Sequence, residues 1–254
     1  MSRLILAIGQ QNGDLSFPLG LISALKSEGV RVAAHDAGGD GMLSAALERG
    51  EPGGKAFVPC LRYDLRSGGS RKMVASSART ADTGSVAVHD LRGGGSDAVC
   101  LLGGSSLLGQ IGGARLTVAH LLSPFQAATD LAAEAIEAWP LDRADHVIVM
   151  EEGAFSLEEA YPLWTDTDTR ERALAGGAVE ITFRTLRAAT IAKITASGGV
   201  LPFGLDLTST ENRKAELGLS SLSRVELTSL GSWCDNFRRE TGKAGPLLGY
   251  PPSE

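Results

Sequence analysis

The feature that most constrains the fold is a regular alternation of short apolar runs with segments of helical periodicity. Runs typical of strands occupy residues 4–8, 30–35, 56–59, 85–90, 97–104, 114–122, 145–150 and 178–183. Helical patterns occupy residues 16–28, 42–48, 124–139, 167–175, 185–196 and 223–240. Such alternation favours a mainly parallel sheet covered on both faces. The sequence therefore predicts a single three-layer α/β domain, residues 1–254, with a predominantly parallel sheet.

The composition agrees with a globular chain. Its 254 residues are 43% hydrophobic, which is enough for a substantial core. No cationic stretch precedes a long apolar run, and no window reaches the roughly 18 apolar residues that a membrane span needs. We therefore predict a cytoplasmic location without a membrane span. Cys60, Cys100 and Cys234 are widely spaced and outside any CxxC motif, so they are interpreted as structural thiols.

The segment 50–95 is the least regular part of the chain. Within it, residues 61–84 are expected to form a flexible basic loop, because Gly and Ser are frequent and Asp64 is the one acidic residue between Arg62 and Arg79, a stretch that also holds Arg66, Arg71 and Lys72. The loop is either solvated or a contact for DNA or another anion. The candidate nucleic-acid residues are Arg62, Arg66, Arg71, Lys72 and Arg79. A net charge of −6 argues against a protein wrapped in nucleic acid. Residues 241–254 are expected to be a frayed tail.

The N-terminal turn has the layout of a phosphate-binding βαβ unit. An apolar strand at 4–8 leads into a turn with Gly9 and Gly13, and a helix follows. Backbone N–H groups and the positive end of a helix attract anions in such turns, while a lysine and a magnesium-binding hydroxyl supply the remaining charge compensation. The GxxxxGK[ST] pattern is absent here. The turn is therefore interpreted as a vestigial nucleotide loop.

The spacing of this turn resembles the ParA/MinD class of P-loop ATPases, whose loop reads KGGxGK[ST]. In that alignment Gln11 replaces the signature lysine, and Asn12 and Gly13 take the places of the glycine pair. Ser16 replaces the phosphate-binding lysine, and Phe17 replaces the magnesium-binding hydroxyl. The resemblance implies a cofactor-binding set of Gly9, Gln11, Asn12, Gly13, Asp14, Ser16, Phe17 and Asp36.

Two further segments resemble parts of the family that supply acidic residues to the nucleotide site. Asp36 ends a strand and matches the aspartate of the family's second acidic motif. Residues 96–109 resemble the strand that delivers the Walker B aspartate, and Leu102 stands in its place. A carboxylate such as Asp14 held about 4 Å from a phosphate charge costs on the order of 4 kcal/mol at an effective dielectric constant near 20. The resemblance, with these replacements, implies a relative that does not hydrolyse ATP and for which neither ATP nor magnesium is an expected cofactor.

The C-terminal half resembles a plasmid-borne branch of the class, similar to StbB and other mobilisation proteins. Residues 145–155, 176–194 and 217–237 carry the likeness, and Glu151 or Glu152 falls where the branch has an adenine-side asparagine. The resemblance implies a role in plasmid partition or conjugative mobilisation. It also implies a homodimer, a partner protein and contact with DNA.

Two other nucleotide-related functions remain as alternative hypotheses. The first is an active ATP-binding ParA-like ATPase with a deviant loop. The second is the N-terminal half of a GT-B glycosyltransferase, because residues 9–32 also resemble the opening of those enzymes, with Gly13 and Asp14 in the acceptor cleft. The length argues against a transferase. These enzymes need a second Rossmann-like half with a donor-binding loop, and the sequence after residue 140 has no such pattern.

The sequence predicts no catalytic residue and no metal ligand. The histidines lack an HExxH pattern, and Ser105 and Ser106 lack a GxSxG elbow. The acidic cluster of Glu151, Glu152, Glu158 and Glu159 is interpreted as a solvated loop in preference to a divalent-ion site. Trp233 is expected in the core, and Trp164 on a partner surface.

Overall fold

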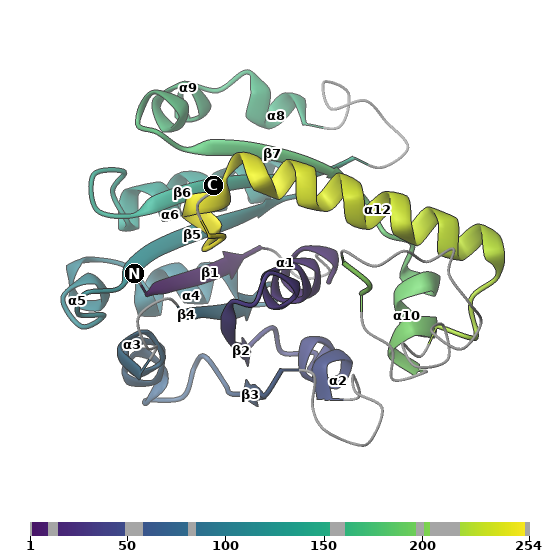
Figure 1. Ribbon diagram of the computed structural model, residues 1–254. Coiled ribbons are helices and arrows are strands. Elements are labelled where there is room, and N and C mark those ends of the chain that lie inside the picture. Colours follow the sequence, from purple (N-terminus) through teal and green to yellow (C-terminus); the bar gives the residue numbers. More distant parts are fainter. Residues whose placement is uncertain are drawn as a thin grey trace.

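The computed structural model contains one seven-stranded sheet in which every strand is parallel to its neighbours (Figure 1). It describes residues 2–9, 15–48, 58–80, 85–152, 161–196, 201–203 and 219–251. The strands are β1 (Arg3–Ile8), β2 (Arg31–Asp36), β3 (Cys60–Arg62), β4 (Ser85–Leu91), β5 (Arg115–Leu122), β6 (Asp145–Glu152) and β7 (Val179–Arg184). Their order across the sheet is β3-β2-β4-β1-β5-β6-β7.

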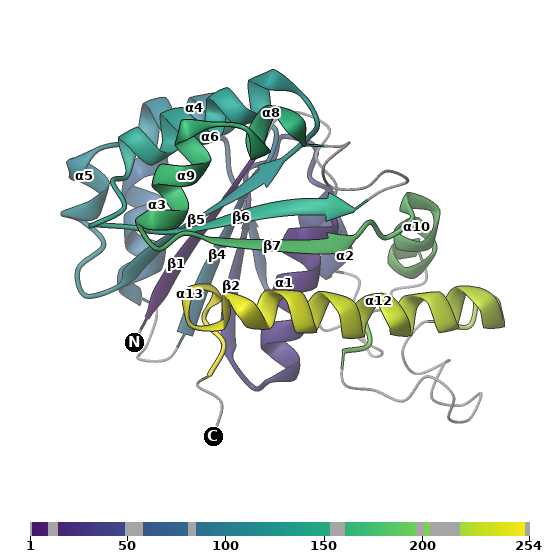
Figure 2. The ribbon, with the colours of Figure 1, turned by 90° about the horizontal axis from the view of Figure 1, so that it is seen from above.

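Helices cover both faces of this sheet (Figures 1 and 2). One face carries α1 (Ser16–Ser27), α2 (Met42–Glu48), α10 (Ala188–Ala196), α12 (Arg224–Lys243) and α13 (Gly245–Leu248). The other carries α3 (Ser70–Thr80), α4 (Gly95–Leu102), α5 (Ser105–Leu108), α6 (Gln126–Ala138), α8 (Pro162–Thr165) and α9 (Asp168–Ala175). The predicted three-layer α/β fold with a parallel sheet is confirmed. None of the helices within the described ranges combines the length and the apolar character of a membrane span.

The central strand shows why the apolar runs form a two-sided sheet. In β1, Ile5 and Ala7 belong to the core under α1 and α12, whereas Leu4, Leu6 and Ile8 belong to the core under α3 and α4. All five side chains are almost completely buried. A strand buried on both faces has no polar alternation, so the continuous apolar run at 4–8 is the expected pattern.

The long helix α12 is fixed by its start and by its aromatic face. Ser223 Oγ accepts a hydrogen bond from the Glu226 N–H, and the Glu226 carboxylate accepts one from the Ser223 N–H. Together these two bonds form a complete capping box. Trp233 and Phe237 then pack against Phe183 of β7 and Phe17 of α1. The expectation that Trp233 lies in the core is confirmed by its 4% exposure.

One predicted strand is a helix. Residues 97–104 were expected in the sheet, but α4 covers Gly95–Leu102. Ala98 and Leu102, four residues apart, are fully buried, whereas Val99 and Leu101 are half-buried and Cys100 is exposed. A short apolar run bounded by glycines does not distinguish a buried strand from one face of a helix. The strand expected at 56–59 is also misplaced, because β3 begins at Cys60 and residues 56–57 lie outside the described residues.

The basic loop and the frayed tail also need correction. Residues 61–84 include the end of β3 and the helix α3, because Val74, Ala75 and Ala78 supply a buried helical face. The tail is packed as far as Tyr250. There α12 continues to Lys243, and Leu248 of α13 is fully buried. The Tyr250 hydroxyl lies 3.0 Å from Thr241 Oγ1.

Candidate functional site

The candidate site lies at the carboxyl ends of the central strands. Ile8 of β1 is in register with Leu91 of β4, and Asp36 of β2 is in register with Asp90 of β4. The loops after these three strands therefore emerge side by side. β1 lies between β4 and β5, so the chain crosses it to reach the second half of the sheet. Ligands of open α/β sheets bind at the carboxyl edge where the strand order changes direction.

Asp36 organises the loop after β2. Its Oδ1 accepts a hydrogen bond from the Gly38 N–H at 3.2 Å, and its Oδ2 accepts one from the Ser44 N–H at 2.9 Å. The side chain is buried, with 2% exposure for the residue. Asp36 therefore uses both carboxylate oxygens to hold residues 37–41 and the first turn of α2.

Asp90 ends β4 and is paired with Arg92. The guanidinium Nε lies 2.8 and 3.0 Å from the two carboxylate oxygens of Asp90, and Nη2 lies 2.8 Å from Oδ2. Both residues are buried, and Asp40 approaches Arg92 Nη2 at 3.9 Å. Burial raises the pKa of the Asp90 carboxyl, and the hydrogen bonds and charge of Arg92 oppose that rise. The Asp90 carboxylate is thus paired with a cation, Arg92, from the loop that follows β4.

Glycine backbones bring the three loops into direct contact. A Cβ atom at Gly93 would lie 2.1 Å from the carbonyl oxygen of Gly38. A Cβ atom at Gly95 would lie 2.5 Å from the carbonyl oxygen of Gly9. Because neither contact leaves room for a side chain, the backbones after β1, β2 and β4 form a continuous floor.

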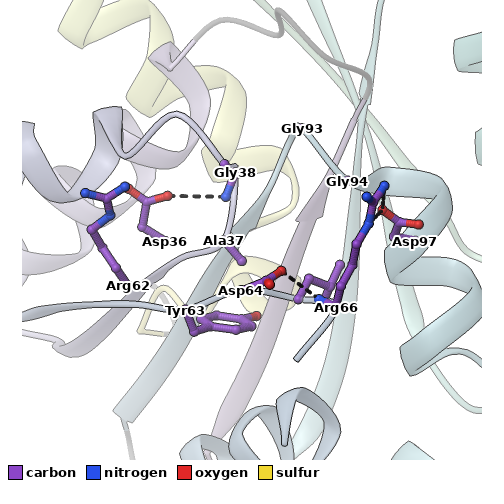
Figure 3. Close-up of a pocket in the computed structure, with 12 residues that line it drawn as sticks. Asp36, Ala37, Gly38, Arg62, Tyr63, Asp64, Arg66, Gly93, Gly94 and Asp97 are labelled. Atoms are coloured by element: carbon purple, nitrogen blue, oxygen red, sulfur yellow. Dashed lines mark hydrogen bonds and ion pairs between the residues drawn. The ribbon is translucent and has the colours of Figure 1, made fainter. Parts of the chain in front are cut away.

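A cavity of about 520 Å³ opens over this floor (Figure 3). Its lining includes Asp36, Gly38, Arg62, Tyr63, Asp64, Arg66, Gly93, Gly94 and Asp97. A neighbouring hollow of about 380 Å³ extends to Gly9 and the start of α4. Arg66 Nε donates to Asp97 Oδ2 at 2.8 Å, and the Arg66 N–H donates to Asp64 Oδ1 at 2.9 Å. Arg62 is exposed and makes no ion pair with the residues that the structure describes.

A buried hydrogen-bond chain runs from the cavity wall into α3. Tyr63 Oη lies 2.9 Å from His89 Nδ1, and His89 Nε2 lies 2.8 Å from Ser77 Oγ. Because Ser77 donates its hydroxyl proton to Val74 O at 2.7 Å, it accepts from the Nε2–H of His89. Tyr63 therefore donates to Nδ1. Burial and the neighbouring His35 lower the pKa of His89, which keeps it neutral.

The residues predicted for a vestigial nucleotide loop lie in different environments. Gly9 and Asp36 lie at the candidate site, while Gln11, Asn12, Gly13 and Asp14 lie outside the described residues. Ser16 is buried in the first turn of α1. Phe17 points into the core, with its ring centroid 6.3 Å from Phe183 and 6.2 Å from Phe237. The aromatic ring of Phe17 is therefore buried among other rings, and its place in the cofactor-binding set stays a prediction.

The sequence interpretation did not include Asp90, which lies near the end of β4, the strand beside β1. Leu102 was aligned with the family's Walker B aspartate, but Leu102 is buried on α4. The strand beside β1 is β4, and the acidic residue near its carboxyl end is Asp90. The signal was present, because residues 31–36 and 85–90 both end in the dipeptide His-Asp.

The candidate nucleic-acid residues do not all face solvent as free cations. Arg66 is paired with Asp97, and Arg71 Nε donates to Leu101 O at 2.9 Å at the C-terminal end of α4. Arg62 and Lys72 are exposed. The side chain of Arg79 lies outside the described residues. Two of the five residues thus serve contacts within the protein.

The remaining candidates are also placed. Trp164 is 1% exposed, and its Nε1 donates to Glu180 Oε1 at 2.8 Å, so the expected partner surface at Trp164 is wrong. Ser105 and Ser106 begin α5. Glu151 and Glu152 end β6, while Glu158 and Glu159 lie outside the described residues. No cluster of three or more metal-ligating side chains occurs among the residues that were described.

The chain has a structural similarity to the signal recognition particle receptor FtsY from Elizabethkingia anophelis in complex with GDP. The two share 12% sequence identity with a TM-score of 0.37, over 72% of this chain and 57% of FtsY. The chain thus spans less than two thirds of the FtsY chain. No protein-family model and no curated protein matches the sequence.

Proposed function

We propose that this chain is a ParA/MinD-like protein that does not hydrolyse nucleoside triphosphates and acts in plasmid partition or conjugative mobilisation through protein contacts. The observation that carries the first part is the buried pair of Asp90 and Arg92 at the end of β4. The sequence likeness of residues 145–155, 176–194 and 217–237 to mobilisation proteins supports the second part.

The geometry of the carboxylates supports the absence of hydrolysis. Phosphoryl transfer by P-loop proteins depends on a lysine and a magnesium ion that neutralise developing charge. Both oxygens of Asp90 accept hydrogen bonds from Arg92, and both oxygens of Asp36 accept backbone N–H groups. Phe17 lies in the core. The described residues therefore do not fit a magnesium–triphosphate complex, and no hydrolytic step is assigned to them.

Calorimetry and an ATPase assay test this proposal. We expect no magnesium-dependent ATP hydrolysis, and no ATP or ADP affinity that depends on magnesium. An intact ParA-type ATPase measured under the same conditions is the positive control. A magnesium-dependent hydrolysis rate comparable to that control would favour the alternative of an active ATPase with a deviant loop.

The order of strands weighs against the glycosyltransferase alternative. Doubly wound dinucleotide-binding sheets have the order 3-2-1-4-5-6, with β1 beside β2. In this chain β4 lies between β2 and β1. A GT-B half of the Rossmann type would need the other arrangement. A calorimetric response to nucleotide sugars would reopen that alternative.

Contact with DNA is a secondary part of the proposal, and it rests on Arg62 and Lys72. Both side chains are exposed and make no ion pair within the described residues. If they bind phosphates, reversal of both charges weakens DNA binding at low salt and reduces the salt slope by about one per lost contact. Arg224, exposed on α12, provides the matched control. An unchanged salt slope removes DNA from the proposal. The proposed function also includes a cytoplasmic location and a partner protein of plasmid partition or mobilisation.

A further inference from the structure

The two hollows of the candidate site share part of their lining. The cavity of about 520 Å³ reaches Asp36 at the end of β2, and the neighbouring hollow of about 380 Å³ reaches Gly9 after β1. Both are lined by Arg66, Gly93, Gly94 and Asp97. The Arg66 side chain extends to Asp97 beside Gly94 (Figure 3). The pair of Arg66 and Asp97 therefore stands at the boundary between the two hollows.

The contact that holds this boundary is an exposed ion pair. Arg66 Nε donates to Asp97 Oδ2 at 2.8 Å, and Arg66 Nη2 lies 2.8 Å from the same oxygen. The two side chains are 76% and 39% exposed. Ion pairs with this exposure contribute little free energy, and salt screens them. The boundary between the hollows is thus held by a weak interaction.

The short segment that carries Arg66 is anchored at its two ends. Before it, Leu65 is buried in the core under α3 and α4, and after it the buried Ser70 begins α3. Residues 66–69 are all exposed, and a Cβ atom at Gly68 or Gly69 would meet no atom within 4 Å. We call residues 66–69 the 66–69 turn. Its glycines leave it free to move about the two anchors without exposing the core.

The wall on the other side of the larger cavity is fixed. The Tyr63 N–H donates to Asp36 O at 3.0 Å, and Tyr63 Oη lies 2.9 Å from His89 Nδ1. Asp36 in turn holds the loop after β2 through the Gly38 and Ser44 N–H groups. A movement of the 66–69 turn therefore changes the boundary between the hollows and leaves this wall in place.

We infer that the 66–69 turn is a gate between the two hollows and that the Arg66–Asp97 pair is its latch. With the pair intact, the Arg66 side chain separates the hollows. When the pair breaks, the turn swings about Leu65 and Ser70, and the hollows become one cleft from Asp36 to Gly9. Because the latch is weak, the open and closed forms are both populated. Gating of this kind does not depend on whether the chain hydrolyses nucleotide.

Limited proteolysis with subtilisin tests the gate, because this protease has broad specificity and needs no arginine. Cleavage of a transiently opened segment tracks the population of the open form. We expect Arg66→Gln and Asp97→Asn each to raise the rate of cleavage within residues 65–70 by about two- to fivefold. The double variant should be cleaved no faster than the single variants, because both changes break the same pair. Lys72→Gln and Asp130→Asn, which remove exposed charges from α3 and α6, leave the rate unchanged.

Salt gives a second readout on the same cut, which mass spectrometry follows separately from cuts elsewhere in the chain. An increase from about 0.05 M to about 0.5 M salt should raise the wild-type rate to that of the double variant, whose own rate stays constant. A free peptide of residues 61–72 corrects for the effect of salt on subtilisin. A single variant cleaved no faster than the wild type, a double variant cleaved faster than both single variants, or a wild-type rate that salt does not change overturns the gate.

Discussion

Arg92 neutralises Asp90 inside the protein, with its Nε 2.8 Å from Oδ1 and its Nη2 2.8 Å from Oδ2. The two residues are separated by Leu91 alone, at the point where β4 leaves the sheet. A buried ion pair of this kind contributes little net stability over an apolar replacement of both partners. Its effect is local, because it fixes the loop that carries Gly93 and Gly94 over the cavity.

Removing the guanidinium should leave an unpaired buried carboxylate. We expect Arg92→Met to lower the free energy of unfolding by about 3–5 kcal/mol at pH 8, measured by urea denaturation. The deficit should shrink as the pH falls, since burial raises the pKa of Asp90 and a protonated carboxyl no longer needs a cation. Arg66→Met, which breaks the exposed pair with Asp97, is the control, with an expected loss below about 1 kcal/mol. An equal loss in the two variants would contradict the role assigned to burial.

The Tyr63 hydroxyl is expected to stabilise the neutral His89 tautomer. Tyr63→Phe removes the donor to a fully buried Nδ1 atom, so the variant should lose about 1–3 kcal/mol of unfolding free energy. Nitrogen chemical shifts in the wild type should report the proton on Nε2, because Ser77 accepts from that atom. A proton found on Nδ1 would show that the chain of donors runs in the opposite direction.

The four histidines predict a loss of stability in mild acid. Burial lowers the pKa of His35 to about 4 and also lowers the pKa values of His89, His120 and His146. Below about pH 6.5 the unfolded chain binds protons that the folded chain excludes, so the unfolding free energy falls as the pH falls from 6.5 toward 4. Each histidine contributes a slope of up to about 1.4 kcal/mol per pH unit.

The measurement is urea denaturation at pH 7.5, 6.5, 5.5 and 5.0, a range that lies above the titration of ordinary carboxyls. His35→Gln removes one proton-binding group from the unfolded chain, so its pH slope should be smaller by up to about 1.4 kcal/mol per unit. Unfolding free energies that stay constant between pH 7 and pH 5 would show that these histidines are protonated in the folded protein.

The central fold was predictable from sequence because the sheet is buried on both faces. Residues 4–8 and 145–150 are continuous apolar runs, and a strand between two helical layers needs that pattern. The run at 97–104 has the same composition and is a helix. Composition alone does not distinguish a buried strand from a helix here. Ala98 and Leu102 lie on one face of a helix, but the same apolar run also has the pattern of a strand buried on both faces.

The error at 97–104 also determined what was missed at the site. A strand at 97–104 beside β1 places Leu102 at the acidic position, which leaves Asp90 out of the predicted site. The pairing with Arg92 depends on the loop geometry after β4, which local sequence rules do not specify. Trp164 lies in an acidic segment and was expected at the surface, but it is buried, and Glu180 of β7 accepts its indole N–H.

Two glycines on packed helices offer a matched test of the contact between α1 and α12. A Cβ atom at Gly20 of α1 would lie 2.8 Å from the Phe237 ring and 2.9 Å from the Trp233 ring, whereas a Cβ atom at Gly242 of α12 would meet no atom within 4 Å. Gly20→Ala should therefore lower the unfolding free energy by about 1–3 kcal/mol, because the aromatic rings have to shift in a close-packed core. Gly242→Ala should raise it by roughly 0.5–1 kcal/mol through the better helix propensity of alanine.

Urea denaturation of both variants beside the wild type measures the difference directly. Since the substitution is the same at both positions, opposite signs would isolate the close approach of α1 to the aromatic face of α12. A stabilised Gly20→Ala variant would mean that Trp233 and Phe237 have room to move and that the two helices lie farther apart than the structure places them.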